Sequence, residues 1–178
     1  ACYRWIREFD PSRPIHYERA EGNDFTDIVC PMYADLNWCK NYLNNSPKKP
    51  LIQCEYSHAM GNSMGNQNDY FKDIYEPYPA MVGEFVWDWK DQGIKMPVPG
   101  KANQYYWAYG GDFGDNPNDG SFCCNGVVLA DNSPTAKSFN MKKIYQPIDF
   151  SLKDSLSGMF TLKNKLQQRI LDDLTINY

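Results

Sequence analysis

The hydrophobic pattern of this chain consists of short apolar runs separated by helical or turn-rich segments. A helical stripe comes first, formed by Cys2, Trp5, Ile6 and Phe9 and ended by two prolines. Four largely apolar runs then predict buried strands at 15–18, 27–33, 51–55 and 81–87. Helical spacing predicts helices at 36–43 and 67–75. Strand, helix, strand order predicts an α/β fold with a parallel sheet covered on both faces, either as a barrel or as an open sheet.

The pattern changes after Trp87, where the chain becomes loop-rich. Segment 110–120 is too long and too polar to be one tight turn, and such loops often carry function. A last helix is predicted at 135–145, and half-buried strands at 158–163 and 174–178. We place a domain boundary near Pro147, which gives units 1–147 and 148–178. Two or three strands cannot form an independent sheet domain, so we expect the second unit to be truncated.

Composition narrows the classes of partner. The 178 residues are 42% hydrophobic, enough for one ordinary core. A net charge of -4, with no run of Lys or Arg longer than two, argues against nucleic acid or a membrane surface as partner. The aromatic content of 15% suits a neutral, partly polar ligand. No stretch approaches the roughly 18 apolar residues of a membrane span, and the charged opening ACYRWIREFD is not typical of a signal peptide.

The six cysteines include no CxxC pair, and we expect mostly buried, reduced thiols. Reduced thiols favour the cytoplasm and leave the periplasm as the alternative compartment.

Three segments carry a resemblance to a known family: LIQCEYSHAMGNS (51–63), GEFVWDWKDQG (83–93) and YGGDFGDNPNDGSFCCNG (109–126). They closely resemble signature segments of the β-galactosidases of glycoside hydrolase family 2, in the family's order. Segments 5–18 and 27–33 also resemble their counterparts, so the likeness covers roughly residues 3–150. The tail more weakly resembles the β-sandwich domain that follows the catalytic barrel in that family.

The resemblance implies that the four predicted strands are the fifth to eighth of a (β/α)8 TIM barrel, followed by the truncated start of a β-sandwich. It also implies a retaining mechanism, which uses two carboxyl groups about 5 to 5.5 Å apart. The nucleophile of the family follows strand seven and matches Glu55. The acid/base belongs to an Asn-Glu pair after strand four, and no Asn-Glu dipeptide exists in this sequence.

Three further residues match substrate-binding positions of the family. Tyr33 matches a tyrosine beside the nucleophile, where a phenol can hydrogen-bond the carboxylate. His58 matches a histidine that hydrogen-bonds sugar hydroxyls, and Trp87 a tryptophan that packs against the sugar. Position alone leaves ordinary structural roles open for all three, and for Glu55 a structural ion pair.

Asn125, together with the backbone carbonyl of Phe122, resembles part of a family site for a sodium ion near the sugar. Another ligand of that sodium, an aspartate of an earlier domain, is absent here, and the magnesium ligands of the family lie outside this chain. Asp112, Asp115 and Asp119 lack the spacing of an EF-hand, so we interpret them as loop-shaping residues.

Two other carboxylates could be considered as the missing acid. Glu84 stands where relatives commonly carry glycine, but strand alternation points it away from the face that carries Trp87. Glu18 ends the first predicted strand, where a structural hydrogen bond is the better interpretation.

The sequence therefore predicts the nucleophile half of a retaining glycoside hydrolase that acts on β-galactosides, with Glu55, Tyr33, His58, Trp87 and Asn125 shaping the site. We expect negligible turnover from the isolated chain, and either oligomerisation or dependence on an N-terminal portion. The alternatives are a noncatalytic carbohydrate-binding or interaction module and a bare structural fragment with exposed sheet edges.

Overall fold

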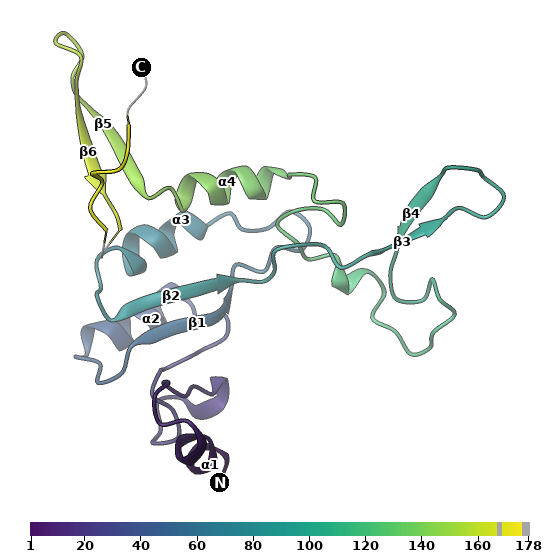
Figure 1. Ribbon diagram of the computed structural model, residues 1–178, viewed down its shortest axis with the longest axis horizontal. Coiled ribbons are helices and arrows are strands. Elements are labelled where there is room, and N and C mark those ends of the chain that lie inside the picture. Colours follow the sequence, from purple (N-terminus) through teal and green to yellow (C-terminus); the bar gives the residue numbers. More distant parts are fainter. Residues whose placement is uncertain (167–168, 176–178) are drawn as a thin grey trace.

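The computed structural model describes residues 1–166 and 169–175 and centres on two parallel strands (Figure 1). Strand β1 (Leu51–Tyr56) pairs with strand β2 (Met81–Val86), with Leu51 opposite Met81 and Gln53 opposite Glu84. The predicted strands at 51–55 and 81–87 are confirmed.

The two earlier predicted strands are present only as isolated parallel bridges. Val29 and Met32 bridge to β1, and His16 bridges to Ile28. The parallel order from 15–18 through 27–33 to β1 and β2 is therefore as predicted, but a continuous strand at 27–33 is not formed. Pro31 has no N–H to donate to a ladder, which limits regular pairing in that segment.

Three helical segments follow the predicted pattern. Helix α1 (Cys2–Phe9) comes first, and α2 (Leu36–Asn44) begins where the Asp35 side chain accepts a 2.8 Å hydrogen bond from the Trp38 amide. Helix α3 (Gln67–Tyr70) continues directly into a π-helical turn, η2 (Phe71–Tyr75).

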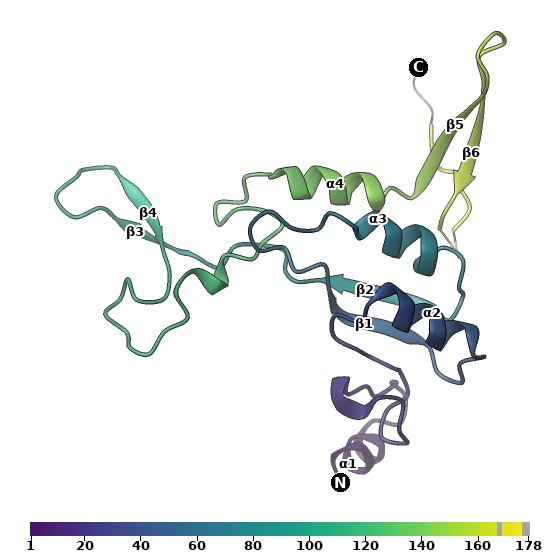
Figure 2. The same cartoon turned by 180° about the vertical axis from the view of Figure 1, so that it is seen from behind.

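Helices α2 and η2 cover one face of the β1–β2 pair, and Figure 2 shows α2 in front of the two strands. The core on this face consists of Val29, Cys39, Leu43, Leu51, Ile74 and Met81. The opposite face is open among the described residues, since Val82 and Phe85 are 49% and 62% exposed. The prediction that both faces are covered is therefore wrong for the part of the chain that the structure describes.

The region after β2 contains a hairpin that the pattern did not predict. Strands β3 (Ile94–Pro97) and β4 (Tyr105–Ala108) are antiparallel, and they lie far from β1 and β2 in both views (Figures 1 and 2). Each strand has four residues, too few for an alternating pattern to stand out from the surrounding loop. Segment 110–119 has only turns and bends, as expected, and a short 3-10 helix, η3 (Gly120–Cys123), follows it.

The C-terminal part begins with α4 (Ala136–Ile144), which confirms the predicted helix and starts with a capping box between Thr135 and Ser138. A two-stranded antiparallel hairpin follows, β5 (Ile148–Asp154) with β6 (Met159–Asn164). Strand β5 was not predicted. Strand β6 was, but its residues are exposed and not half-buried, because the hairpin extends beyond the helices (Figure 1). Of the predicted strand 174–178, residues 174–175 are not in a strand, and 176–178 lie outside the described residues.

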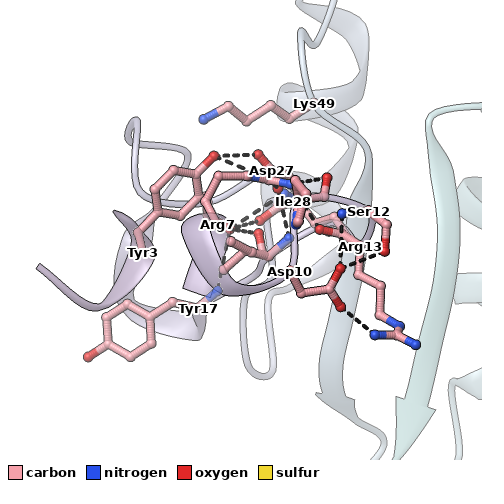
Figure 3. Close-up of polar contacts among 12 residues, drawn as sticks. Tyr3, Arg7, Asp10, Ser12, Arg13, Tyr17, Asp27, Ile28 and Lys49 are labelled. Carbon is pink, nitrogen blue, oxygen red and sulfur yellow. Dashed lines mark hydrogen bonds and ion pairs between the residues drawn. The ribbon is translucent and has the colours of Figure 1, made fainter. Parts of the chain in front are cut away.

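A polar network ties α1 to the segment at 15–28, as Figure 3 shows. Tyr3 donates a 2.8 Å hydrogen bond to Asp27, and Arg7 forms an ion pair with the same carboxylate. The Ile15 amide donates a 2.7 Å hydrogen bond to Asp27 Oδ2, the oxygen that also pairs with Arg7. These contacts, led by the Ile15 amide and the Tyr3 hydroxyl, lower the pKa of Asp27. Asp27 therefore fixes α1 beside the His16–Ile28 bridge.

All six cysteines are free thiols, but only Cys30 and Cys39 are buried, so the prediction of mostly buried cysteines is wrong. Cys2 lies on the exposed helix α1, and Cys123 and Cys124 lie at the partly open end of η3. No helix within residues 1–166 and 169–175 is long and apolar enough to cross a membrane.

Candidate active site

Glu55 lies near the C-terminal end of β1, where the pairing with β2 is irregular. Gln53 is opposite Glu84 and Tyr56 is opposite Val86, so β1 advances three residues while β2 advances two. This is the signature of a β-bulge, a feature that re-aims side chains and is common beside active sites. On its other side Glu55 bridges to Met32, and its carbonyl accepts a 2.8 Å hydrogen bond from the Tyr33 amide.

Tyr33 is placed beside the Glu55 carboxylate by an unusual backbone conformation. Its φ of 54° lies in the left-handed region, which is uncommon for a residue other than glycine. Tyr33 is 40% exposed, but partial desolvation of its phenol raises its pKa, and the neighbouring Glu55 carboxylate raises it further. The phenol therefore keeps its proton and is available as a donor to Glu55.

His58 lies between Tyr33 and the η3 segment. Its ring centroid is 6.0 Å from that of Tyr33 and 5.8 Å from that of Phe122. Residues from three separate parts of the chain, at 33, 55–58 and 122, therefore meet at the C-terminal end of β1.

Trp87 and Asn125 line a common cavity with Phe122, at the C-terminal end of β2. The backbone joins these segments, because the Asp88 amide donates to the Asn125 carbonyl at 3.0 Å. Asn125 is 2% exposed, and its Oδ1 has no hydrogen-bond partner among the described residues. A buried oxygen without a partner is costly, so Asn125 presents an unused acceptor or ligand atom at this position.

Two of the three loop aspartates accept hydrogen bonds from backbone amides of the loop, as expected of loop-shaping residues. Asp112 accepts from the Tyr109 amide at 2.9 Å, and Asp115 accepts from the Gly111 amide at 3.0 Å. Asp115 and Asp119 both line the cavity of Trp87 and Asn125. Among residues 1–166 and 169–175, no three His, Cys, Asp or Glu side chains are grouped as they would be to hold a metal ion.

The two other carboxylates lie elsewhere. Glu84 lines a cavity on the helix-covered side with Phe71, Tyr75 and Tyr145, while Trp87 lines a different cavity, as strand alternation predicted. Glu18 forms a 2.8 Å ion pair with Arg19. Neither residue lines the cavity of Trp87 and Asn125.

One set of contacts was missed by the sequence reasoning. Tyr56, directly after Glu55, is 1% exposed. Its hydroxyl accepts a hydrogen bond from Gln67 Nε2 and also contacts the Tyr145 hydroxyl. The predicted strand at 51–55 ends one residue before Tyr56, and the two partners of Tyr56 are 11 and 89 residues away in the sequence.

The arrangement defines a parallel α/β domain whose candidate site lies at the carboxyl ends of its strands, as in TIM-barrel enzymes. Residues 1–150 match the family described as "Glycosyl hydrolases family 2, TIM barrel domain". The chain therefore belongs to glycoside hydrolase family 2, and it contains part of the TIM-barrel domain of that family.

The similar curated proteins are named β-galactosidase. The chain is 43% identical to one from Priestia megaterium over 92% of its own length, and 44% identical to one from Pseudoalteromonas haloplanktis over 86%. It spans 16% of the length of each. Among solved structures, a family 2 β-galacturonidase from Eisenbergiella tayi matches 81% of this chain and 29% of its own, with 13% identity and a TM-score of 0.49.

Proposed function

We propose that the protein to which this chain belongs is a retaining glycoside hydrolase that acts on β-galactosides, with Glu55 as its nucleophile. The observation that carries the proposal is the bulged end of β1, which sets the Glu55 carboxylate beside Tyr33, whose ring centroid lies 6.0 Å from that of His58. The names of the relatives support galactosides as the substrate class.

In the proposed reaction, a Glu55 oxygen bonds to the anomeric carbon as the bond from that carbon to the leaving oxygen breaks. The leaving oxygen takes a proton from a second carboxylic acid, which we place outside this chain. A water oxygen then bonds to the same carbon as its bond to the Glu55 oxygen breaks, and the second carboxylate accepts a proton from that water. Tyr33 donates to Glu55, His58 and Asn125 bind sugar hydroxyls, and Trp87 packs against the ring.

The four parallel segments are, in this proposal, strands five to eight of the barrel, and β5–β6 is the first hairpin of a following β-sandwich. The first half of the barrel would cover the exposed face that carries Val82 and Phe85. We expect the isolated chain to have negligible turnover, because the catalytic acid lies outside it. We also expect it to self-associate, because the apolar face is left uncovered.

The substrate class and the stereochemistry can be tested together on the full-length protein. We expect hydrolysis of an aryl β-D-galactoside at least tenfold faster than that of the matching β-D-glucuronide, with β-galactose as the first product by proton NMR. First release of α-galactose would contradict the retaining mechanism. Calorimetric galactose binding that is lost in Trp87→Ala, without any hydrolysis, would favour a noncatalytic carbohydrate-binding module.

A sodium ion fits the chemistry at Asn125. The buried Asn125 Oδ1 lacks a partner, and the carbonyl of the nearby Phe122 offers a second oxygen, the ligand type that hard cations prefer. These two residues would hold the ion, which would supply positive charge close to the sugar hydroxyls. The magnesium ligands of the family lie outside this chain.

We predict that NaCl raises the melting temperature of the full-length protein more than choline chloride at equal ionic strength, because the ion binds only the folded state. Asn125→Ala should remove at least half of that sodium-specific difference. Asn62→Ala, an exposed substitution in the loop after β1, is the matched control and should keep it. An undiminished sodium effect in Asn125→Ala would exclude Asn125 as a ligand.

A further inference from the structure

Tyr56 occupies the buried side of β1 directly after the proposed nucleophile. Its hydroxyl is 2.6 Å from that of Tyr145, which follows α4, and it accepts a 3.0 Å hydrogen bond from Gln67 Nε2 at the start of α3. The centroids of the Tyr56 and Tyr70 rings are 5.6 Å apart in an edge-to-face arrangement. One phenol therefore joins the end of β1 to two helices, and Figure 1 shows α3 and α4 next to each other.

The bulge in β1 depends on where Tyr56 lies. Regular alternation would place Gln53 and Glu55 on the same face and Tyr56 on the other. Instead Gln53 and Tyr56 are both buried, at 0% and 1% exposure, and Glu55 is only half-buried beside Tyr33. The extra residue of the bulge thus lets Tyr56 return to the helix-covered face while Glu55 turns away from it.

The main chain of Tyr56 also holds the other side of the site. Its carbonyl accepts a 3.2 Å hydrogen bond from the Trp87 amide, and the Trp87 carbonyl accepts a 2.7 Å hydrogen bond from the Ala59 amide. Movement of Tyr56 would therefore shift Glu55 and Trp87 together.

We propose that Tyr56 is a positioning residue, whose hydroxyl, held between Gln67 and Tyr145, fixes the bulge that turns Glu55 toward the sugar. The inference rests on the proposed function. It assigns Tyr56 no contact with substrate. Its effect is on the geometry of Glu55, and a displacement of about 1 Å can reduce a rate by about 10².

The test is Tyr56→Phe in the full-length protein, which keeps the buried ring and removes the hydroxyl. We expect kcat for an aryl β-galactoside and the rate of Glu55 labelling by a 2-fluoro galactoside to fall about 10- to 100-fold. KM should change less than threefold, because the sugar contacts remain. Tyr145→Phe should show the same split, and the double variant should be no slower than the slower single variant, since both lose one shared contact.

Tyr42→Phe is the matched control. The Tyr42 hydroxyl donates a 2.7 Å hydrogen bond to the Lys49 carbonyl, also on the helix-covered side but away from the end of β1. We expect a lower melting temperature and an unchanged kcat. If Tyr56→Phe and Tyr145→Phe behave in the same way as Tyr42→Phe, Tyr56 is merely structural and the inference is wrong. If the parent protein neither hydrolyses galactosides nor is labelled at Glu55, the proposed function fails as well.

Discussion

Replacement of Glu55 by glutamine in the full-length protein is expected to reduce kcat for β-galactosides at least about 10³-fold. The amide has nearly the shape of the carboxylate, so the backbone contact with Tyr33 and the bulge should persist. It cannot form the glycosyl ester. Substrate binding should be retained, which makes the loss one of chemistry and not of folding.

The control for this substitution is Glu8→Gln, at an exposed position of α1. It makes the same chemical change, and we expect kcat within twofold of the parent value. Steady-state kinetics with an aryl galactoside, together with melting temperatures for both variants, distinguish a loss of catalysis from a loss of folding. Near-parental hydrolysis by Glu55→Gln would exclude Glu55 as the nucleophile.

The second large effect concerns stability and comes from Glu84. Both carboxylate oxygens of Glu84 are buried without a hydrogen-bond partner among the described residues, and the side chain of Gln53, opposite in register, is equally unpartnered. Burial raises the pKa of Glu84 from 4.5 to about 8, although the nearby Tyr56 hydroxyl, which does not reach hydrogen-bonding geometry, lowers it in part. We predict that Glu84→Gln increases the free energy of unfolding at pH 8 by about 1 to 3 kcal/mol, because the amide needs no proton in order to be buried neutral.

The pH dependence gives the sign of this effect. The folded carboxyl holds its proton more tightly than the unfolded one, so the stability from its neutral form is complete below pH 4.5 and is lost as the pH rises through about 8. At about 1.4 kcal/mol per pKa unit the loss is on the order of 4 kcal/mol. In urea unfolding between pH 5 and 9, the free energy of unfolding of the parent protein should decline with rising pH. The decline should be much shallower in Glu84→Gln.

Glu76→Gln provides a control of opposite sign. Glu76 pairs with Lys163 at 2.9 Å and with Lys165 at 3.5 Å, and these lysines lower its pKa despite partial burial. Its contribution is present above the ordinary carboxyl pKa, so this variant should be slightly less stable than the parent at pH 8. If the free energy of unfolding changed equally with pH in the parent and in Glu84→Gln, the assignment of a neutral Glu84 would be contradicted.

Those parts of the fold that rest on local patterns could be predicted from the sequence. Helices α2 and α4 were predicted from the residue pattern at 36–43 and 135–145, and the structure adds the caps at Asp35 and Thr135. The parallel order follows from the alternation of strands and helices. The hairpin β3–β4 was missed because each of its strands has only four residues. Strand β5 was missed although Ile148, Phe150 and Leu152 alternate with polar residues.

The candidate site could be predicted only as a set of residues. The family resemblance of four separate segments identified Tyr33, His58, Trp87 and Asn125 beside Glu55, and the structure places them around the ends of β1 and β2. The bulge between Gln53 and Tyr56 could not be predicted, because it appears only when β1 is aligned with β2, 30 residues away. The buried Asn125 Oδ1 likewise required the position of its neighbours.

The central claim is that Glu55 bonds covalently to the sugar. Its most direct test is to treat the full-length protein with an activated 2-deoxy-2-fluoro-β-galactoside and to map the modified peptide by mass spectrometry. We predict one fluorosugar per active site, attached to Glu55 in segment 51–63, and no label in Glu55→Gln. Label on another carboxylate, with Glu55 unmodified, would contradict the account.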